Sequence, residues 1–343
     1  MSERRVALVT GGSRGIGRAI ALGLAEDGVD VAISYRRDAD AAAETAAGAE
    51  ALGVRGRAYP ATLGAPEAAE ALAAAVLDDL GRVDILVSNA GVASRGLRVT
   101  ATDHAELERV IGTHAMAAHH LCGLLVPQMR GRTRGDVVVV SSIATRLLAA
   151  GGAPYSMAKA ALEALALTLA KEERESGIRV NIVAPGLVDT EMGRRLVRAT
   201  EGVEDIRTLD ARSPFGRVCT PEDVASVVRF LVSDRCASSV ADSGAGATGP
   251  RAGGCRRVST SCATSPSSPP GPPRERSSPT GASRSPGRST SRRPGHGSSS
   301  GHFRPRPSPA TSTASPSGRS STPRGRASPS TPCSRASRPP PST

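Results

Sequence analysis

The sequence predicts an α/β fold, in which a doubly wound parallel sheet is covered by helices on both faces. From residue 6 to residue 231, short apolar runs alternate with longer, alanine-rich stretches of helical periodicity. This alternation is typical of a parallel sheet with crossover helices. A glycine-rich turn also joins the first apolar run to the first helical stretch, which predicts a strand–turn–helix unit at the start of the fold.

The first part of the chain alternates between strands and helices. Strands are predicted where short apolar runs occur, at 6–9, 31–35, 57–60 and 85–87, the third being the weakest. Helices are predicted at 18–26, 39–52 and 66–80. Gly53 and Gly81 follow the second and third helices, and glycine is common at this position because it adopts the left-handed conformation without strain.

The second part continues the pattern. Helices are predicted at 103–129, from Tyr155 to about residue 175, and at 221–231; strands are predicted at 137–140 and 179–183. Pro221 begins the last helix, a position that suits proline because the first-turn N–H groups have no partner within the helix.

The turn after the first strand reads Thr10-Gly11-Gly12-Ser13-Arg14-Gly15-Ile16-Gly17. Its glycines let the backbone approach a pyrophosphate, and the following helix offers free N–H groups and the positive end of its dipole. A strand, a tight turn and a helix in this order are the context of a dinucleotide site, so we predict a Rossmann-like fold.

Tyr155 and Lys159 form a second motif far along the chain. They are four residues apart in Tyr155-Ser156-Met157-Ala158-Lys159, so on a helix they share one face. An ammonium group beside a phenol favours the phenolate, which makes the tyrosine usable as a proton donor and acceptor.

Taken in order, these motifs resemble those of the short-chain dehydrogenase/reductase family. The family pattern is TGxxxGxG, then NAG, then a serine, then YxxxK, and Asn89-Ala90-Gly91 and Ser142 supply its middle parts here. The resemblance covers about residues 5–233 and is strongest to 3-oxoacyl-(acyl carrier protein) reductases. The family continues with a seventh strand, but the sequence from residue 237 offers none, so we expect the sheet to lack it.

The resemblance implies a carbonyl reductase that transfers hydride from NADP(H) to a ketone, such as a 3-oxoacyl thioester, and so acts on CH–OH groups. Tyr155 would protonate the carbonyl oxygen, Ser142 would hold that oxygen, and Lys159 would lower the pKa of Tyr155 and bind the ribose. Ser141 is expected to be structural, and Asn89 to brace the sheet. The residues implied to contact the cofactor are Gly11, Ser13, Arg14, Gly15, Ile16, Gly17, Tyr35, Arg36, Arg37, Asn89, Ala90, Gly91, Tyr155, Lys159, Pro185, Gly186, Val188 and Thr190.

The end of the second strand indicates the cofactor. NAD enzymes of this architecture have an acid there for the ribose 2′-hydroxyl, whereas this chain has Tyr35-Arg36-Arg37, with Arg14 in the glycine-rich turn. An arginine cluster suits a 2′-phosphate, so we predict NADP(H). The alternative is a solvated basic rim.

Two residues depart from the family pattern. His114 stands where the family usually has an asparagine that holds a water near Lys159; it is assigned either a catalytic-support or a structural role, and as a histidine it is expected to titrate near neutral pH. Thr62 replaces an aspartate that meets the adenine, which should weaken cofactor binding. The alternative to an active enzyme is a non-catalytic nucleotide-binding relative disabled by His114, Thr62 and the altered C-terminus, but Ser142, Tyr155 and Lys159 are intact.

The basic composition belongs to the C-terminal part of the chain. Residues 243–343 contain 16 arginines and one acidic residue, whereas residues 1–242 contain 28 basic and 31 acidic residues, which predicts no nucleic-acid interface on the folded domain. From residue 251 onward, Val258 and Phe303 are the only large apolar residues. We therefore predict one reductase domain at 1–242 and a disordered Arg/Pro/Ser-rich tail at 243–343.

The codon pattern of this tail suggests a frameshift. From residue 251, all residues except Val258, Glu275, His296, His302 and Phe303 require G or C at the second codon position. In a GC-rich gene the third position is almost always G or C, and a shifted frame turns it into the second. A frameshift near residues 234–243 is therefore our hypothesis; the alternative, an evolved linker or RNA-binding tail, lacks the interleaved aromatic residues of single-strand binders.

The six cysteines have no CxxC or metal-type spacing, so we predict unpaired thiols, a reducing compartment and no metal site. No signal peptide fits before Val6 and no apolar run approaches the roughly 20 residues of a membrane span, so a cytoplasmic protein without membrane partners is expected. We also expect a homodimer formed by the helices at 103–129 and 155–175, through residues such as Ala118, Leu121, Leu124 and Leu162. The missing strand should impair a tetramer.

Overall fold

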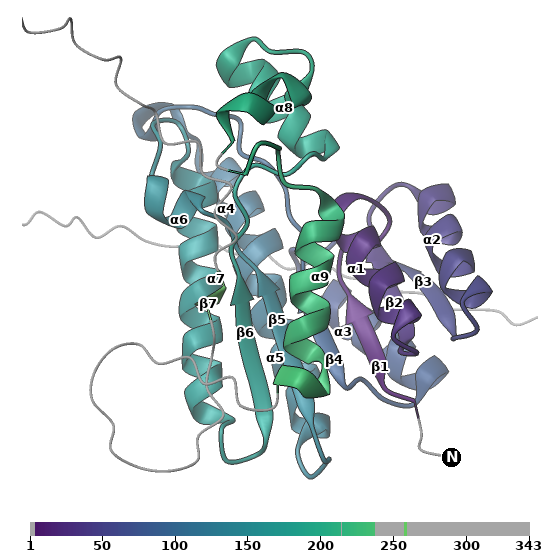
Figure 1. Cartoon of the computed structure of the whole chain (residues 1–343). Coiled ribbons are helices and arrows are strands. Elements are labelled where there is room, and N and C mark those ends of the chain that lie inside the picture. Colours follow the sequence, from purple (N-terminus) through teal and green to yellow (C-terminus); the bar gives the residue numbers. More distant parts are fainter. Residues whose placement is uncertain (1–3, 214, 237–256, 259–343) are drawn as a thin grey trace, which may run out of the picture. The chain divides into compact units, whose positions relative to one another are not determined.

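A computed structural model describes residues 4–213, 215–236 and 257–258, all within the unit Met1–Pro270. Its central element is a parallel sheet in the order β3-β2-β1-β4-β5-β6-β7 (Figure 1). The strands are β1 (Val6–Val9), β2 (Asp30–Tyr35), β3 (Gly56–Pro60), β4 (Ile85–Ser88), β5 (Gly135–Val140), β6 (Ile178–Val183) and β7 (Arg257–Val258). The strand order reverses between β1 and β4, and ligands of such sheets bind at the carboxyl ends of the strands at this point.

Helices cover both faces of the sheet. The main ones are α1 (Gly15–Glu26), α2 (Ala39–Ala51), α3 (Pro66–Leu80), α4 (His104–Ile111), α5 (Ala117–Met129), α7 (Ala153–Glu172) and α9 (Pro221–Val232). Side chains such as Val9 and Ile33 form one core with α1, α2 and α9, whereas Leu8 and Leu86 form the other with α3, α5 and α7. Strands β1 to β6 each supply side chains to both cores, because successive side chains of a strand point to opposite faces.

Most predicted elements are confirmed. The six predicted strands lie within two residues of the observed bounds, and the helix at 66–80 matches α3. The helix predicted at 18–26 begins earlier, at Gly15, and the Tyr155 helix ends at Glu172 rather than near residue 175.

The helix predicted at 103–129 is interrupted. Between α4 and α5 the backbone forms a π-helical turn, η2 (Gly112–Met116), which carries His114. Oγ1 of Thr113 lies 2.9 Å from the carbonyl oxygen of Arg109 and 3.3 Å from that of Leu63, so its hydroxyl links this turn to the loop after β3. Turns of this type are rare and are frequent at functional sites.

Several short elements near the carboxyl ends of the strands were not predicted from the sequence. These are α6 (Ala144–Leu147), α8 (Glu191–Glu201) and the 3₁₀ helix η3 (Ile206–Arg212). In Figure 1, α8 lies beyond the carboxyl end of β6, where it can cover part of a ligand site.

The expectation of no seventh strand is corrected by a short pairing. Two residues, β7, pair in parallel with the end of β6: Arg257 with Ile182 and Val258 with Val183. Val258 is β-branched, a residue type that favours strands. Along the rest of β6 no described residue pairs on this side. Arg257 and Val258 lie within the tail predicted to be disordered at 243–343; the other residues of that tail, and residues 237–243 of the range predicted for a frameshift, lie outside the described residues.

At the amino ends of the strands, a buried carboxylate joins the sheet to the end of α9. Asp136, at the start of β5, is 0% exposed and forms ion pairs with Arg5, Arg134 and Arg179. The three guanidiniums also donate hydrogen bonds to backbone carbonyls between residues 231 and 236. Because the last carbonyls of a helix have no partner within it, this cluster caps α9.

The described part of the chain bears on three further expectations, which concern the cysteines, a metal site and a membrane span. Within these residues, Cys122, Cys219 and Cys236 are buried, and none of them forms a disulfide. Within the same residues, no cluster of three or more His, Cys, Asp or Glu side chains could hold a metal ion. None of the helices described is both long and apolar enough to cross a bilayer.

Candidate active site

The glycine-rich turn has the backbone geometry that close approach of an anion requires. Gly11 and Gly15 have φ values of 66° and 54°, a conformation that strains other residues. At Gly17 an added Cβ would lie 2.2 Å from the carbonyl oxygen of Gly11, so only glycine lets α1 start this close to the turn. The turn is therefore a cradle that side chains would fill.

Asn89, directly after β4, braces this turn from the neighbouring strand, as predicted. Its Nδ2 donates to the carbonyl oxygens of Thr10 at 2.9 Å and Gly11 at 3.2 Å. The backbone nitrogens of Asn89 and Ala90 each donate to Oγ1 of Thr10 at 2.9 Å. The predicted Asn89-Ala90-Gly91 motif thus lies beside the turn and holds its shape.

No side chain of α1 neutralises the positive end of its dipole, which lies next to the glycine-rich turn. Arg14 is the N-cap residue, no side chain caps the helix there, and its first turn contains no acidic residue. Free N–H groups and a positive dipole end suit a phosphate. Gly15, Ile16 and Gly17 form this first turn, and Ser13 is buried just before it.

Arginines gather at the carboxyl end of β2. Tyr35 is the last residue of that strand, and the exposed Arg36 and Arg37 follow it. Within the described part of the chain, neither forms an ion pair with a carboxylate. The pKa of Arg36 is lowered by partial burial and then by the charges of Arg37, Arg109 and Arg14. These charges repel one another, so an anion bound among them would be stabilised.

The segment after β6 lies against both the cradle and the loop of Ser142. The carbonyl oxygen of Pro185, which precedes Gly186, accepts a hydrogen bond from the backbone nitrogen of Ile143 at 2.9 Å. Ile143 is the neighbour of Ser142, so this bond fixes the two loops to each other.

Thr190 is the N-cap residue of α8 and lies close to the glycine-rich turn. An added Cβ on Gly15 would lie 3.4 Å from Cγ2 of Thr190, which places the two residues in contact distance. Arg14 crosses the same gap and pairs with Glu191 of α8, with 2.6 Å between Nη1 and Oε2. Val188, two residues before Thr190, is buried. The glycine-rich turn and the start of α8 therefore lie against each other.

Ser142, Tyr155 and Lys159 come together at the carboxyl end of β5. Lys159 is one helical turn after Tyr155 on α7, and its Nζ lies 5.7 Å from the centroid of the phenol ring. This Nζ donates to the carbonyl oxygen of Val140 at 2.6 Å. Ser142 forms a hydrogen bond with Tyr155 that acts to lower the pKa of the phenol. Lys159 is 3% exposed, whereas Ser142 and Tyr155 are partly exposed toward the site.

Burial governs the pKa values of this pair. It lowers the pKa of Lys159 to about 7, while the charge of Glu163 raises it. Burial raises the pKa of Tyr155, and the hydrogen bond from Ser142 opposes this rise. The expected lowering of the Tyr155 pKa by Lys159 is not found: burial raises this pKa, and the ammonium of Lys159 donates to the carbonyl oxygen of Val140.

His114 lies between Tyr155 and the loop after β4. Its Nε2 is 3.0 Å from the backbone nitrogen and 2.9 Å from the carbonyl oxygen of Val92, so it accepts from one or donates to the other, depending on the tautomer. Burial, and then the charge of Lys159, lower the pKa of His114 to about 3. The expectation that His114 titrates near neutral pH is therefore wrong, because a buried imidazole beside a cation resists protonation.

Two carboxylates at the site were not singled out from the sequence. Oε1 of Glu163 accepts a hydrogen bond from Oγ of Ser141 at 2.7 Å, which confirms a structural role for Ser141. Glu163 could have been found from its spacing, because it lies four residues after Lys159 and therefore on the same face of the helix. Glu191, the partner of Arg14, was missed together with α8. Thr62 is exposed after β3.

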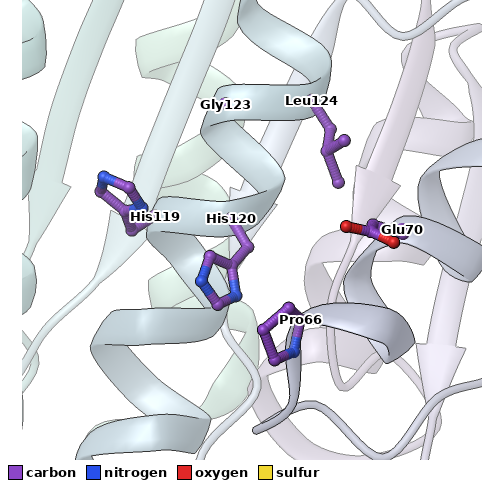
Figure 2. Close-up of a pocket in the computed structure, with 6 residues that line it drawn as sticks. All are labelled: Pro66, Glu70, His119, His120, Gly123 and Leu124. Carbon is purple, nitrogen blue, oxygen red and sulfur yellow. The ribbon is translucent and has the colours of Figure 1, made fainter.

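A separate hollow of about 220 Å³ lies between α3 and α5 (Figure 2). It is lined by Pro66, Glu70, His119, His120, Gly123 and Leu124. Figure 2 shows His120 turned toward Pro66 and His119 directed away from it. None of the predicted site residues lines this hollow, so it is not part of the candidate active site.

Comparisons with known proteins agree with this geometry. Residues 11–242 match the family described as enoyl-(acyl carrier protein) reductase. A 3-oxoacyl-(acyl-carrier-protein) reductase of Vibrio cholerae is 35% identical over 235 residues, which are 68% of this chain and 92% of the relative.

Two solved structures share the fold. A short-chain dehydrogenase from Burkholderia cenocepacia in complex with NADP is 33% identical, with a TM-score of 0.64 over 76% of this chain and 97% of that one. L-sorbose reductase from Gluconobacter frateurii, complexed with NADPH and L-sorbose, is 30% identical, with a TM-score of 0.65 over 75% of this chain and 95% of that one.

Proposed function

Because this chain belongs to the short-chain dehydrogenase/reductase family of oxidoreductases, we propose that it is an NADPH-dependent reductase that transfers hydride to a ketone. The observation that carries this proposal is the convergence of Ser142, Tyr155 and Lys159 at the carboxyl end of β5. The glycine-rich cradle lies at the same edge of the sheet, two strands away. A proton donor and a dinucleotide site at one edge are what a reductase of this kind requires.

The residues at this edge fit a nicotinamide dinucleotide. The cradle at Gly11 and Gly17 leaves room for a pyrophosphate that a Cβ would fill. The uncapped amino end of α1 supplies N–H groups, and Arg36 and Arg37 supply positive charge without carboxylate partners among the described residues. Lys159 would hold the ribose near the nicotinamide, with Val188 against the ring and the segment from Pro185 to Thr190 beside its carboxamide. The fit supports a bound cofactor with an extra phosphate.

Each group of the triad has one task. When bound, the nicotinamide supplies the hydride, a reactant that no side chain can provide. Ser142 holds the substrate oxygen by a hydrogen bond, and Tyr155 donates its phenolic proton to that oxygen as the C–H bond forms. Negative charge develops on this oxygen during the reaction, so both donors act where the charge appears. Lys159, whose pKa is about 7, is available to return a proton to Tyr155.

The preference for NADPH over NADH rests on charge. A 2′-phosphate forms charge-assisted hydrogen bonds with arginine, which a 2′-hydroxyl does not. Arg36 and Arg37 stand at the strand end where NAD enzymes place an acid. The two solved relatives, which hold NADP and NADPH, support the same choice.

For the substrate we propose a 3-oxoacyl thioester, carried by a small molecule or by an acyl carrier. The reductase of Vibrio cholerae is named for this reaction. Met192 and Leu196, one turn apart on α8, are 41% and 56% exposed, so they offer apolar surface for an acyl chain. The alternative is a nucleotide-binding protein without catalysis. The departures from the family pattern at Thr62 and His114 favour it, but neither position supplies a group that takes part in the proposed reaction.

Turnover of NADPH with acetoacetyl-coenzyme A, followed by absorbance, tests the proposal. Tyr155→Phe should bind NADPH like the wild type and lose at least about 100-fold in kcat, because only the proton donor is removed. Ser156→Ala, one residue away on the same helix, is the control and should stay active. A wild-type protein that binds NADPH but reduces no ketone would support the non-catalytic alternative.

A further inference from the structure

Glu163 is a buried carboxylate beside the catalytic residues. It is 8% exposed and lies one turn after Lys159 on α7. Residues four apart share a helix face, so Glu163 lies on the face that carries Lys159. A glutamate is seldom buried unless it is paired or hydrogen-bonded, because burial disfavours its charge. Its partners therefore indicate what it does.

Glu163 holds the loop of Ser142 from both sides. Its Oε1 accepts from Oγ of Ser141 at 2.7 Å and lies 3.1 Å from Oγ1 of Thr145. Oγ1 of Thr145 is also 3.1 Å from the carbonyl oxygen of Ser142. One carboxylate thus ties the residues on either side of Ser142 to α7, the helix that carries Tyr155.

The charge of Glu163 also acts on Lys159. The groups around Lys159 are Tyr155 and Glu163 from α7, His114 from η2, and the carbonyl oxygen of Val140 from β5. His114 is neutral near pH 7, and burial disfavours the ammonium. Glu163 is the carboxylate that opposes this effect and raises the pKa of Lys159.

We propose that Glu163 is a positioning residue of this active site: it fixes the Ser142 loop and favours the protonated form of Lys159. The kinetic consequences of this inference rest on the proposed reductase function. The protonation of Lys159, by contrast, is a property of the chain that can be measured without turnover. A residue that only satisfied two hydroxyl groups would not change that protonation.

Four variants of the full chain separate the two roles. Glu163→Gln removes the charge and keeps the size, whereas Glu163→Asp keeps the charge. Ser141→Ala removes one hydrogen bond to Glu163 without changing any charge. Glu172→Gln makes the same charge change at an exposed position of the same helix and is the matched control. Circular dichroism verifies that each variant is folded.

The chain contains only two lysines, Lys159 and Lys171, so its lysine spectrum is simple. In protein labelled with ¹³C at the lysine Cε, two signals can be titrated separately, and the exposed Lys171 serves as an internal reference. The Lys159 midpoint should lie near pH 7 in the wild type. It should fall by at least about one pH unit in Glu163→Gln and stay near the wild-type value in Glu163→Asp, Ser141→Ala and Glu172→Gln.

Kinetics test the second role. Glu163→Gln should lower kcat for ketone reduction at least about 10-fold and move the alkaline limb of kcat/KM to lower pH. Ser141→Ala should lower kcat without moving that limb. An unchanged Lys159 midpoint in folded Glu163→Gln overturns the inference. A wild type without reductase activity whose Lys159 midpoint depends on Glu163 would instead contradict the proposed function and leave the electrostatic role of Glu163 supported.

Discussion

The imidazole of His114 packs edge-on against the phenol of Tyr155, with ring centroids 5.3 Å apart and planes inclined at 87°. Nδ1 of His114 is buried without a hydrogen-bond partner in the structure, and its pKa is about 3. His114 is therefore a neutral ring near pH 7. It acts on Tyr155 through shape and packing rather than through charge.

A pH-dependent loss of stability should follow from this burial. The pKa of His114 is about 3 in the folded chain and about 6.5 in the unfolded chain, so between these values only the unfolded chain binds the proton. The free energy of unfolding should fall as the pH drops below 6.5, by up to about 1.4 kcal/mol per pH unit from this group. His114→Asn should lack this contribution.

Urea unfolding at pH 7 and pH 5.5 measures the effect. His104→Asn, which changes a mostly exposed histidine at the start of α4, is the control and should follow the wild type. If the difference between wild type and His114→Asn is the same at both pH values, His114 does not titrate as the geometry indicates. For the same reason, we expect no break in the activity profile near pH 6–7 from His114.

Strands β1, β2, β4, β5 and β6 could be predicted from the sequence because each is a short, mainly apolar run that is buried on both faces, whereas β3 is partly exposed and gave the weakest signal. The glycine-rich turn could be predicted because its glycines are required by local backbone geometry, as Gly17 against Gly11 shows. Such features depend on residues close together in the chain. Ser142, Tyr155 and Lys159 were found through the spacing of known motifs, and the structure brings them together.

Other features depend on packing between distant segments and could not be predicted. The π-helical turn at His114 and the low pKa of this residue arise from burial against the loop after β4, which no periodicity reveals. Glu163 resembles a surface glutamate on an alanine-rich helix until Ser141 is placed beside it. α8 buries only Gly193 and Val197, so its apolar pattern is weak, although Thr190 was a readable cap.

Cofactor preference should depend on Arg36 and Arg37. Replacing both with alanine should reduce the preference for NADPH over NADH by roughly 2–3 kcal/mol, the scale of charge-assisted hydrogen bonds to a phosphate. Dissociation constants for both nucleotides, measured by fluorescence titration, decide this. Arg4→Ala, an exposed arginine before β1, is the control and should keep the preference. A wild type that prefers NADH would contradict the cofactor proposal itself.

The capping cluster at the end of α9 should be important for stability. Asp136→Asn leaves Arg5, Arg134 and Arg179 without their shared counter-charge, a change that typically costs about 3–5 kcal/mol for a buried pair. For a domain of this size the melting temperature should fall by roughly 10 °C. Asp234→Asn is the control, because Asp234 pairs with Arg134 but is fully exposed. Equal melting temperatures for both variants would show that the cluster does not secure α9.

The surface available for dimer formation differs in part from the predicted one, since Leu124 is exposed as expected but most of the other residues are not. Ala118, Leu121 and Leu162, which we expected to face a partner, are buried in the core of their own chain. The exposed apolar residues of these helices are Met116, Leu124, Met157 and Leu167, at 38–50% exposure. α7 packs against α4 and η2. A second copy that packs on these helices would bury such side chains.

We therefore predict that Leu167→Glu shifts a homodimer to a monomer, because a charge in such an interface loses its hydration. Light scattering coupled to gel filtration gives the mass. Leu52→Glu, at a residue 48% exposed after α2, is the control and should remain dimeric. A Leu167→Glu protein that stays dimeric would place the interface elsewhere, and a wild-type tetramer would contradict the expected impairment of tetramer assembly.

The C-terminal region should contribute to stability only through β7. Deleting residues 259–343 should change neither activity nor melting temperature, since Phe303 is the one large apolar residue in that segment.

Deleting residues 251–343 also removes β7 and exposes the end of β6. Losing about two backbone hydrogen bonds should cost roughly 1–2 kcal/mol, or about 3–6 °C, and the freed edge should increase aggregation. Calorimetry and light scattering on the two truncated chains measure these effects. Equal melting temperatures would show that β7 adds nothing, whereas a large loss on deleting 259–343 alone would contradict both the disorder and the frameshift hypotheses.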